Sequence, residues 1–268
     1  MMGPGHVDGI ADLHSHVLPG VDDGASDLEA AVAIARLAAA EGIATLVATP
    51  HTLDGVFEVE RDKARAAREL LVAALASARI AVAIRVAAEV RYHESIPERL
   101  ASDKTLTLDG GGRYLLLELP HESAPPGLCD LVFRLRAAGT TPIIAHPERN
   151  RAVRAEPGIV AEWLRVGALL QLTAGSLTGA FGEPIRATAL RLLSAGQVHV
   201  IATDTHSEAK RPPIVQAAFQ VAAEIVGETG ALRIVHANPL AILHGDHANA
   251  IVPAMARKRR GFFAALRW

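Results

Sequence analysis

The sequence predicts an α/β fold in which short parallel strands alternate with helices along most of the 268 residues. Most apolar runs are continuous rather than alternating, which is typical of parallel strands covered by helices on both faces. Helical stretches separate these runs, and several end at a glycine that leads into the next run. The number of such units favours a closed or nearly closed β/α barrel, whereas periodicity alone also permits an open doubly wound sheet.

The expected strands are short apolar segments spread along the chain. We place them at residues 9–14, 44–48, 81–87, 114–119, 142–145, 168–172 and 198–202. Ser26 and Glu29 form a capping box ahead of a helix that ends at Gly42. The other expected helices cover residues 58–77, 129–138, 159–166 and 184–195.

No low-complexity linker interrupts this pattern, so we expect a single domain over residues 1–268. Its core extends from about residue 10 to about residue 250, and residues 254–268 form a basic, partly apolar tail. We expect this tail to dock on the domain or to fray in solvent, with contact to an anionic membrane as the alternative.

Composition narrows the classes of function. Lys and Arg number 27 against 29 Asp and Glu, for a formal net charge of −2, which argues against nucleic-acid binding because such domains usually carry a basic excess. The single cysteine, Cys129, excludes an intramolecular disulfide and a Cys-rich zinc site, and it fits a reducing cytoplasm. No apolar run reaches the length of a transmembrane segment, and residues 1–9 lack the features of a secretory signal.

Side chains that bind metals follow nearly every expected strand. They are His14, His16, His51, Glu89, Glu118, His146, Asp204 and His206. His14 and His16 lie two residues apart on an extended segment and therefore project to the same side, as do Asp204 and His206. Because the carboxyl ends of barrel strands meet at one rim, we expect these side chains to share a pocket. Imidazole and carboxylate without thiolate suit zinc, iron or manganese.

A structural role could explain any single one of these residues, but it does not explain the whole set. A lone histidine at a strand end is more often a hydrogen-bonded loop residue than a ligand. We assign the remaining histidines to that class: His6, His93, His121, His199, His236, His244 and His247. Cys129 begins an apolar helix without a glycine cradle, which disfavours a cysteine-dependent phosphatase. The chain also lacks a P-loop and a serine-hydrolase elbow, and residues 110–112 predict a turn.

An ordered set of motifs resembles the PHP (polymerase and histidinol phosphatase) superfamily, and within it the CpsB/YwqE-type bacterial protein-tyrosine phosphatases. The motifs are DLHSH at 12–16, VDDG at 21–24, ATPH at 48–51, IAHPER at 144–149 and ATDTH at 202–206. The segment LTAGSL at 172–177, with Phe181 and Gly182, also fits this subfamily. The resemblance extends from about residue 10 to residue 213, which is most of the chain.

The resemblance implies a distorted (β/α)7 TIM-like barrel of the PHP type. It also implies three divalent metal ions, usually described as manganese in this family, with iron or zinc as alternatives. Matched motif by motif, one ion takes His14, His16, Glu89 and Asp204, a second takes Glu89, Glu118 and His146, and a third takes Asp23, His51 and His206. Asp23 is preferred to Asp22 because it is the second aspartate before the glycine. Arg149 and Arg211 match the catalytic, phosphate-binding arginines.

The same resemblance implies a metal-dependent protein-tyrosine phosphatase that hydrolyses phosphotyrosine with a metal-bridging hydroxide. The implied partner is the tyrosine-rich tail of a kinase that controls capsular or exopolysaccharide synthesis. We expect the protein itself to be cytoplasmic. Alternatives stay open: a PHP phosphoesterase for a small substrate such as histidinol phosphate, a nuclease, or a non-catalytic metal-binding scaffold. The nearly balanced charge gives the nuclease no support.

Overall fold

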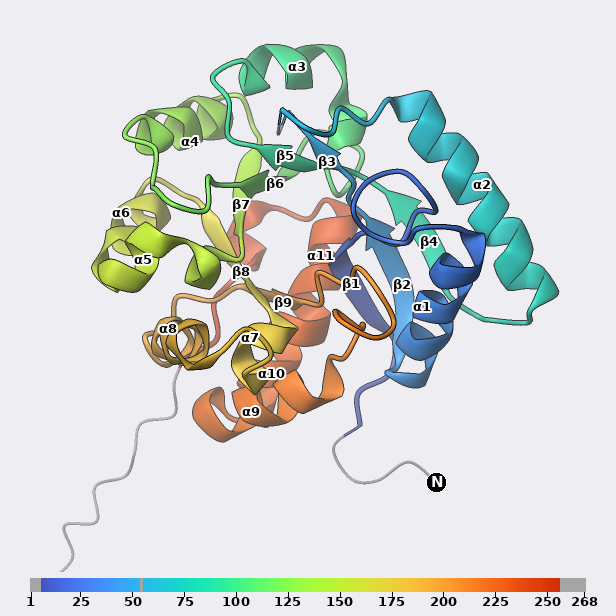
Figure 1. Cartoon of the computed structure of the whole chain (residues 1–268). Coiled ribbons are helices and arrows are strands. Elements are labelled where there is room, and N and C mark those ends of the chain that lie inside the picture. Colours follow the sequence, from blue (N-terminus) through green and yellow to red (C-terminus); the bar gives the residue numbers. More distant parts are fainter. Residues whose placement is uncertain (1–5, 54, 256–268) are drawn as a thin grey trace, which may run out of the picture.

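The computed structural model describes residues 6–53 and 55–255, and it has the expected α/β architecture of parallel strands with helices around them (Figure 1). The strands are β1 (Ile10–Ser15), β2 (Ile43–Ala48), β3 (His51–Thr52), β4 (Ala83–Val86), β5 (Glu89–Arg91), β6 (Tyr114–Glu118), β7 (Thr141–Ala145), β8 (Leu169–Thr173) and β9 (Val200–Ala202). They form a sheet of order β1-β2-β4 and a sheet of order β3-β5-β6-β7-β8-β9. Every pairing between these strands is parallel.

Each strand expected from the sequence is present, and two of them continue beyond a break. β2 ends before Thr49 and Pro50 and resumes as β3, because proline lacks an N–H for the ladder and restricts the residue before it. β4 is interrupted at Ala87 and Ala88, without a proline, and resumes as β5. The hydrogen bonds from Ala87 N to Ala48 O (2.9 Å) and from Glu89 N to Pro50 O (3.2 Å) keep the two breaks in register. As a result, His51 pairs directly with Glu89.

The helices lie between successive strands and after β9. They are α1 (Leu28–Ala40), α2 (Arg61–Ser77), α3 (Ile96–Ser102), α4 (Leu128–Ala137), α5 (Arg151–Ala155), α6 (Val160–Arg165), α7 (Ala174–Thr178), α8 (Glu183–Ser194), α9 (Gln216–Val226), α10 (Glu228–Leu232) and α11 (Asn238–His244). The five helices expected from the sequence correspond to α1, α2, α4, α6 and α8. Among the described residues, no helix combines the length and the apolar character that a membrane crossing requires.

The cap of α1 differs from the expected one. Asp27, rather than Ser26, is the N-cap, and its carboxylate accepts a hydrogen bond from Ala30 N at 2.9 Å. Ser26 instead donates its hydroxyl hydrogen bond to Asp27. The carboxylate therefore takes the capping position because it accepts more strongly than a hydroxyl and complements the positive end of the helix dipole.

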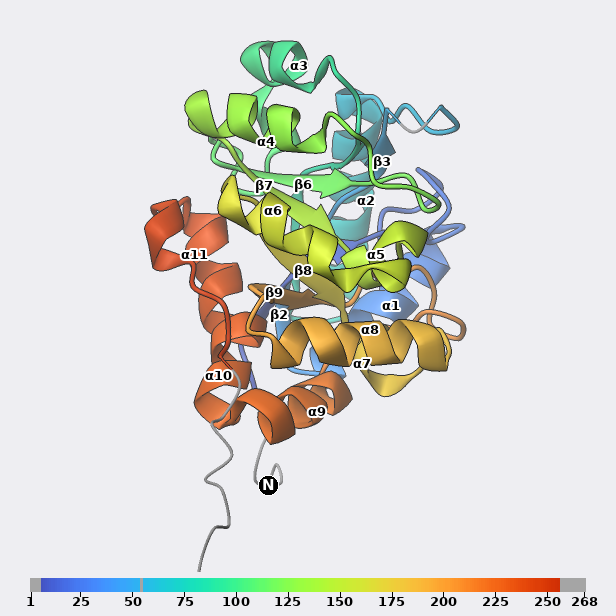
Figure 2. The same cartoon turned by 90° about the vertical axis from the view of Figure 1, so that its left-hand side faces the viewer.

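Two apolar clusters fill the interior. The larger cluster joins the outer faces of the strands to the surrounding helices. The smaller cluster combines alternate strand residues, such as Leu116 and Ile143, with Ile242 and Leu243 of α11. Figure 2 shows α11 at the amino ends of the strands, opposite the loops that follow their carboxyl ends. The amino ends are therefore closed by apolar packing, which leaves polar side chains to the opposite end.

The end of β1 is hydrogen-bonded to the segment that follows β9. Asp204 N donates to His14 O at 2.9 Å, and His16 N donates to Thr205 O at 2.8 Å. These bonds bring the HxH motif beside the DxH motif, although 190 positions of the sequence separate His14 from Asp204. Of the expected tail at 254–268, all but Ala254 and Met255 lies outside the described residues.

We expect His199 to make folding stability depend on pH. This buried side chain accepts a hydrogen bond from Leu170 N at 3.3 Å, and burial lowers its pKa to about 4. A depressed folded-state pKa means that its stabilising contribution is complete above the unfolded value and is lost as the pH falls from about 6.5 to 4. The loss amounts to about 1–3 kcal/mol.

Urea unfolding of the wild type and of His199→Asn at several pH values measures this loss. Asparagine keeps an acceptor for Leu170 N but does not titrate, so its stability should fall less steeply below pH 6.5. Other titrating groups contribute equally to both proteins. Identical pH profiles would show that His199 is not the source.

Candidate metal centre

The His, Asp and Glu side chains predicted to bind metal gather at the carboxyl ends of the strands. They form four overlapping groups in which the potential ligand atoms lie within 4.8 Å of one another. The groups are His16, Asp23, His51 and His206; His14, Glu89 and His146; His14, His16 and Asp204; and His51, Glu89 and Glu118. Because the groups share members, the nine residues make one continuous cluster, which we call the donor cluster.

Two of the three ligand sets implied by the resemblance have all their members adjacent. Asp23 Oδ1 lies 3.4 Å from Nε2 of both His51 and His206. His14 and His16 face Asp204, and Glu89 Oε2 lies 3.3 Å and 3.4 Å from their Nε2 atoms. The third set is divided between two groups. Glu89 is common to both, but Glu118 is grouped with His51, and His146 is grouped with His14.

Two donors occupy unusual backbone conformations. His146, directly after β7, has φ 33°, and Asp204, just after β9, has φ 53°. Non-glycine residues rarely adopt this left-handed region, which costs roughly 1–3 kcal/mol per residue and persists where the surroundings enforce it. This backbone conformation directs both side chains into the donor cluster, close to the ends of their strands.

Three residues that the sequence analysis did not select orient the donors. Gln171 of β8 accepts a hydrogen bond from His14 Nδ1 at 2.9 Å, which leaves Nε2 facing the cluster. Asp22 accepts from His16 Nδ1 at 2.7 Å, and Arg91 pairs with Glu118 at 2.9 Å. The signal for Gln171 was present in the sequence, because a glutamine within a buried apolar strand requires a partner.

The charges in the cluster compensate one another. Burial opposes protonation of His51, but the neighbouring carboxylates of Asp23 and Glu89 outweigh it and raise the pKa of His51 to about 10. Burial also opposes ionisation of Asp204, yet the charge of His14 and a hydrogen bond from His16 hold its pKa well below the usual value. Carboxylates that hold imidazoles protonated in this way can hold a divalent cation in place of the protons.

Two buried atoms directly support a cation. His51 Nδ1 and Glu89 Oε2 lie 3.0 Å apart, but their geometry does not make a hydrogen bond, and neither has another hydrogen-bond partner among the described residues. Burial and the neighbouring charge of Glu89 also raise the pKa of Glu118. Buried polar atoms without a hydrogen bond destabilise the folded state, and so does the repulsion between the neighbouring carboxylates of Glu89 and Glu118. A cation bound between these atoms would offset both effects. The residues therefore fit divalent metal ions.

The two arginines singled out in the sequence meet at Asp204. Arg149 Nη1 lies 2.5 Å from Asp204 Oδ2, and Arg211 Nη2 bonds the same oxygen. The other oxygen, Oδ1, faces His14 and His16 at 3.3 Å and 3.5 Å. One carboxylate thus has separate edges for the guanidinium groups and for the imidazoles.

The turn that carries Arg149 is attached to the neighbouring strand. Glu148 is completely buried, and its Oε1 accepts a hydrogen bond from Thr173 N at the end of β8 at 2.9 Å. Burial raises the pKa of this carboxyl to about 7.

His121 lies at the edge of the donor cluster. Its half-exposed ring stacks on His146, with ring centroids 6.2 Å apart. The sequence assigned His121 to a loop, and the structure brings it to the edge of the cluster.

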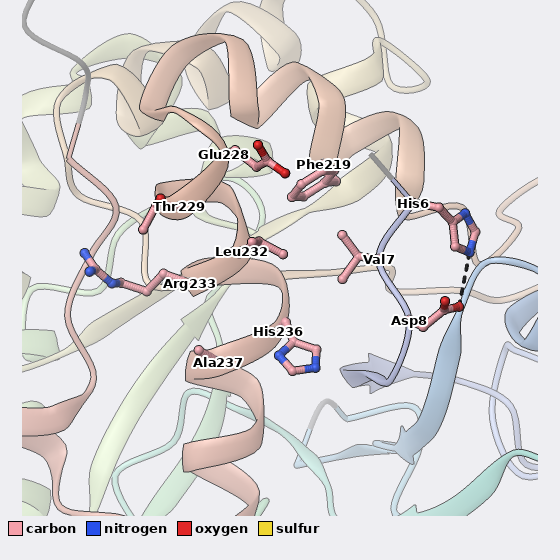
Figure 3. Close-up of a pocket in the computed structure, with 10 residues that line it drawn as sticks. All are labelled: His6, Val7, Asp8, Phe219, Glu228, Thr229, Leu232, Arg233, His236 and Ala237. Carbon is pink, nitrogen blue, oxygen red and sulfur yellow. Dashed lines mark ion pairs between the residues drawn. The ribbon is translucent and has the colours of Figure 1, made fainter. Parts of the chain in front are cut away.

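A cavity lies away from the donor cluster, against α9 and α10. This cavity of about 650 Å³ is lined by residues that include His6, Asp8, Glu228, Arg233 and His236 (Figure 3). Within it, His6 and Asp8 form an ion pair at 3.3 Å. No member of the donor cluster lines this cavity, and none of the metal-ligand groups found among the described residues includes its side chains. The residue types therefore favour the donor cluster over this cavity as the functional site.

Cation binding should be measurable without any assay of activity. Adding Mn²⁺ to chelator-treated protein should raise Tm by about 5–10 °C, because a ligand that binds only the folded state stabilises it. His14→Ala removes a donor shared by two groups and should abolish most of this shift. Differential scanning calorimetry measures the change.

His244→Ala is the matched control, because His244 is exposed on α11 and belongs to none of these groups. This variant should keep the full shift. Equal shifts in wild type and in His14→Ala would remove the donor cluster as the site.

The chain is similar to a described protein family and to named proteins. Residues 10–244 match the family model described as "Capsular polysaccharide synthesis, CpsB/CapC". The tyrosine-protein phosphatase YwqE of Bacillus subtilis is 36% identical over 210 residues, which cover 78% of this chain and 82% of YwqE. The tyrosine-protein phosphatase CpsB of Streptococcus pneumoniae is 29% identical over 239 residues, covering 87% of this chain and 97% of CpsB.

A solved structure supports the same relationship. It comes from a crystallographic study of YwqE from Bacillus subtilis and CpsB from Streptococcus pneumoniae, described there as unique metal-dependent tyrosine phosphatases. It superposes with a TM-score of 0.83 at 32% identity and covers 93% of this chain and 100% of its own. With the family model matched over most of the sequence, the chain belongs to the CpsB/CapC family of capsular polysaccharide synthesis.

Proposed function

We propose that this chain is a metal-dependent protein-tyrosine phosphatase that hydrolyses phosphotyrosine in a protein substrate. The observation that carries the proposal is the position of Asp204, whose two oxygens face two arginines on one side and the imidazoles of the donor cluster on the other. A phosphoryl group bound by the arginines would lie beside the cluster. The names of the relatives YwqE and CpsB support the same activity.

The nine members of the donor cluster would hold the metal ions, and we propose three ions of manganese, with iron or zinc compatible with the same donors. When bound, such ions make a coordinated water acidic near neutral pH and offset the negative charge of the phosphoryl oxygens. Gln171 and Asp22 would keep Nε2 of His14 and His16 directed at the ions.

Arg149 and Arg211 would bind the phosphoryl group. Each guanidinium presents several N–H donors in a plane, a geometry that matches phosphoryl oxygens. Asp204 holds both groups in place before substrate arrives, which lowers the cost of orienting them. Tyrosinate, with a conjugate-acid pKa of about 10, leaves more readily than an alkoxide and needs less help from a general acid.

Cysteine chemistry finds no support at the only thiol of the chain. Cys129 lies on α4 and is half-buried, and burial raises the pKa of its thiol. A nucleophilic cysteine needs a lowered pKa, so this environment opposes a thiolate.

We also propose that the strands form a distorted (β/α)7 barrel of the PHP type within one domain over residues 1–268. In this interpretation β2 with β3 and β4 with β5 each count as one interrupted strand. The hydrogen bonds that link His14 and His16 to residues 204–205 support closure between β1 and the segment after β9.

The biological substrate we propose is a phosphotyrosine protein of capsular or exopolysaccharide synthesis, the tail of a tyrosine kinase above all. The description of the matched family supports the connection with capsule synthesis. A cytoplasmic location remains a prediction that rests on the resemblance and on the single cysteine.

Loss of Arg149 should impair turnover selectively. With Mn²⁺ and a phosphotyrosine peptide, Arg149→Ala should reduce kcat/KM by about 10²–10³, because a donor aimed at developing negative charge is removed. Arg151→Ala is the matched control, since Arg151 is 72% exposed and pairs with Glu122 on the surface. Chelator should abolish wild-type turnover. Undiminished activity in Arg149→Ala and after chelation would contradict the proposed function.

Comparing substrates in the same assay separates the two phosphatase alternatives. We expect a higher kcat/KM for a phosphotyrosine peptide than for histidinol phosphate. The reverse order would assign the chain to small-molecule phosphoesterases, although the metal centre would stand.

A further inference from the structure

Phe181 touches both arginines that the proposed function assigns to the phosphoryl group. The carbon at the centre of the Arg149 guanidinium lies 5.0 Å from the centroid of the Phe181 ring, and that of Arg211 lies 5.8 Å away. One aromatic ring therefore contacts two cations that repel each other. The cation–π interaction energy increases when the cation is partly removed from water, as both guanidinium groups are here.

The chain is shaped to present this ring. Phe181 is half-buried between α7 and α8, flanked by Gly179 (φ +89°) and Gly182 (φ +87°), which occupy backbone conformations that favour glycine. The ring rests on Gly175, because a Cβ built there would lie only 3.0 Å from Phe181 Cε2. Two glycines bend the segment and a third makes room for the ring.

The arginines have few other constraints. Both bond the same oxygen of Asp204, and Arg211 Nε is buried without a hydrogen-bond partner among the described residues. A carboxylate oxygen alone fixes the distance of a guanidinium but not the tilt of its plane, which a flat ring face does fix.

We propose that Phe181 is a positioning residue that holds the guanidinium planes of Arg149 and Arg211 in the orientation that binds a phosphoryl group. This inference rests on the proposed function only for the reaction, because the same orientation governs the binding of inorganic phosphate. Phe181 acts through the arginines and not on the reacting atoms.

Phe181→Leu removes the ring face but keeps an apolar side chain. In the Mn²⁺-loaded protein, it should weaken inorganic phosphate binding in calorimetry by about 5- to 30-fold and lower kcat/KM for a phosphotyrosine peptide by a similar factor. Phe181→Tyr, which keeps the ring face, should restore both to about wild-type values. Phe133→Leu is the matched control, since Phe133 is 64% exposed on α4. Phe181→Met provides a second flexible replacement if Phe181→Leu does not fold.

A double-mutant cycle distinguishes positioning from general support of the fold. In an Arg149→Ala background, Phe181→Leu should reduce phosphate affinity and kcat/KM by a clearly smaller factor than in the wild type. The reason is that one of the two arginines that Phe181 contacts is then absent. The same loss in both backgrounds, or no weakening of phosphate binding, would overturn the inference. Failure of wild type to cleave phosphotyrosine would instead refute the proposed function, while phosphate binding would still decide the role of Phe181.

Discussion

The structure depends on one buried carboxylate that serves two partners at once. Asp204 Oδ2 holds two guanidinium groups, while Oδ1 faces the imidazoles of the donor cluster. Removing either the guanidinium groups or the imidazoles would destabilise the fold, because a buried charge needs a partner in a medium of low dielectric constant. In the proposed function, cation binding and anion binding would therefore be coupled through the single side chain of Asp204.

Interruptions in the strands and unusual backbone conformations place several residues of the donor cluster. The breaks between β2 and β3 and between β4 and β5 bring His51 and Glu89 opposite each other. The left-handed backbone of His146 and Asp204 turns two more donors inward. Apolar packing at the opposite ends of the strands contributes stability that offsets the cost of these departures.

Local pattern was sufficient for the strands and for the donors that recur as motifs. Mostly apolar runs mark the longer strands, and the two-residue spacing of His14 and His16 indicates that they project to the same side. The glutamine in a buried apolar strand signalled that Gln171 needs a partner, but the sequence did not identify that partner as His14. It also did not show that Asp22 pairs with His16 or that Phe181 lies against the two arginines, because these contacts depend on the folded backbone. Nor could it find β3 and β5, whose two and three residues are too short for periodicity to detect. The cap of α1 was displaced by one residue because adjacent Ser26 and Asp27 are both good caps.

The central claim is that residues from most of the strands enclose cations next to two phosphate-binding arginines. Crystals grown with Mn²⁺ and inorganic phosphate, examined by anomalous scattering at the manganese absorption edge, test it most directly. We expect anomalous peaks within the donor cluster, one of them in contact with Asp204 Oδ1, and a phosphate bound by Arg149 and Arg211. A cluster without peaks, or manganese bound only elsewhere on the protein, would contradict it.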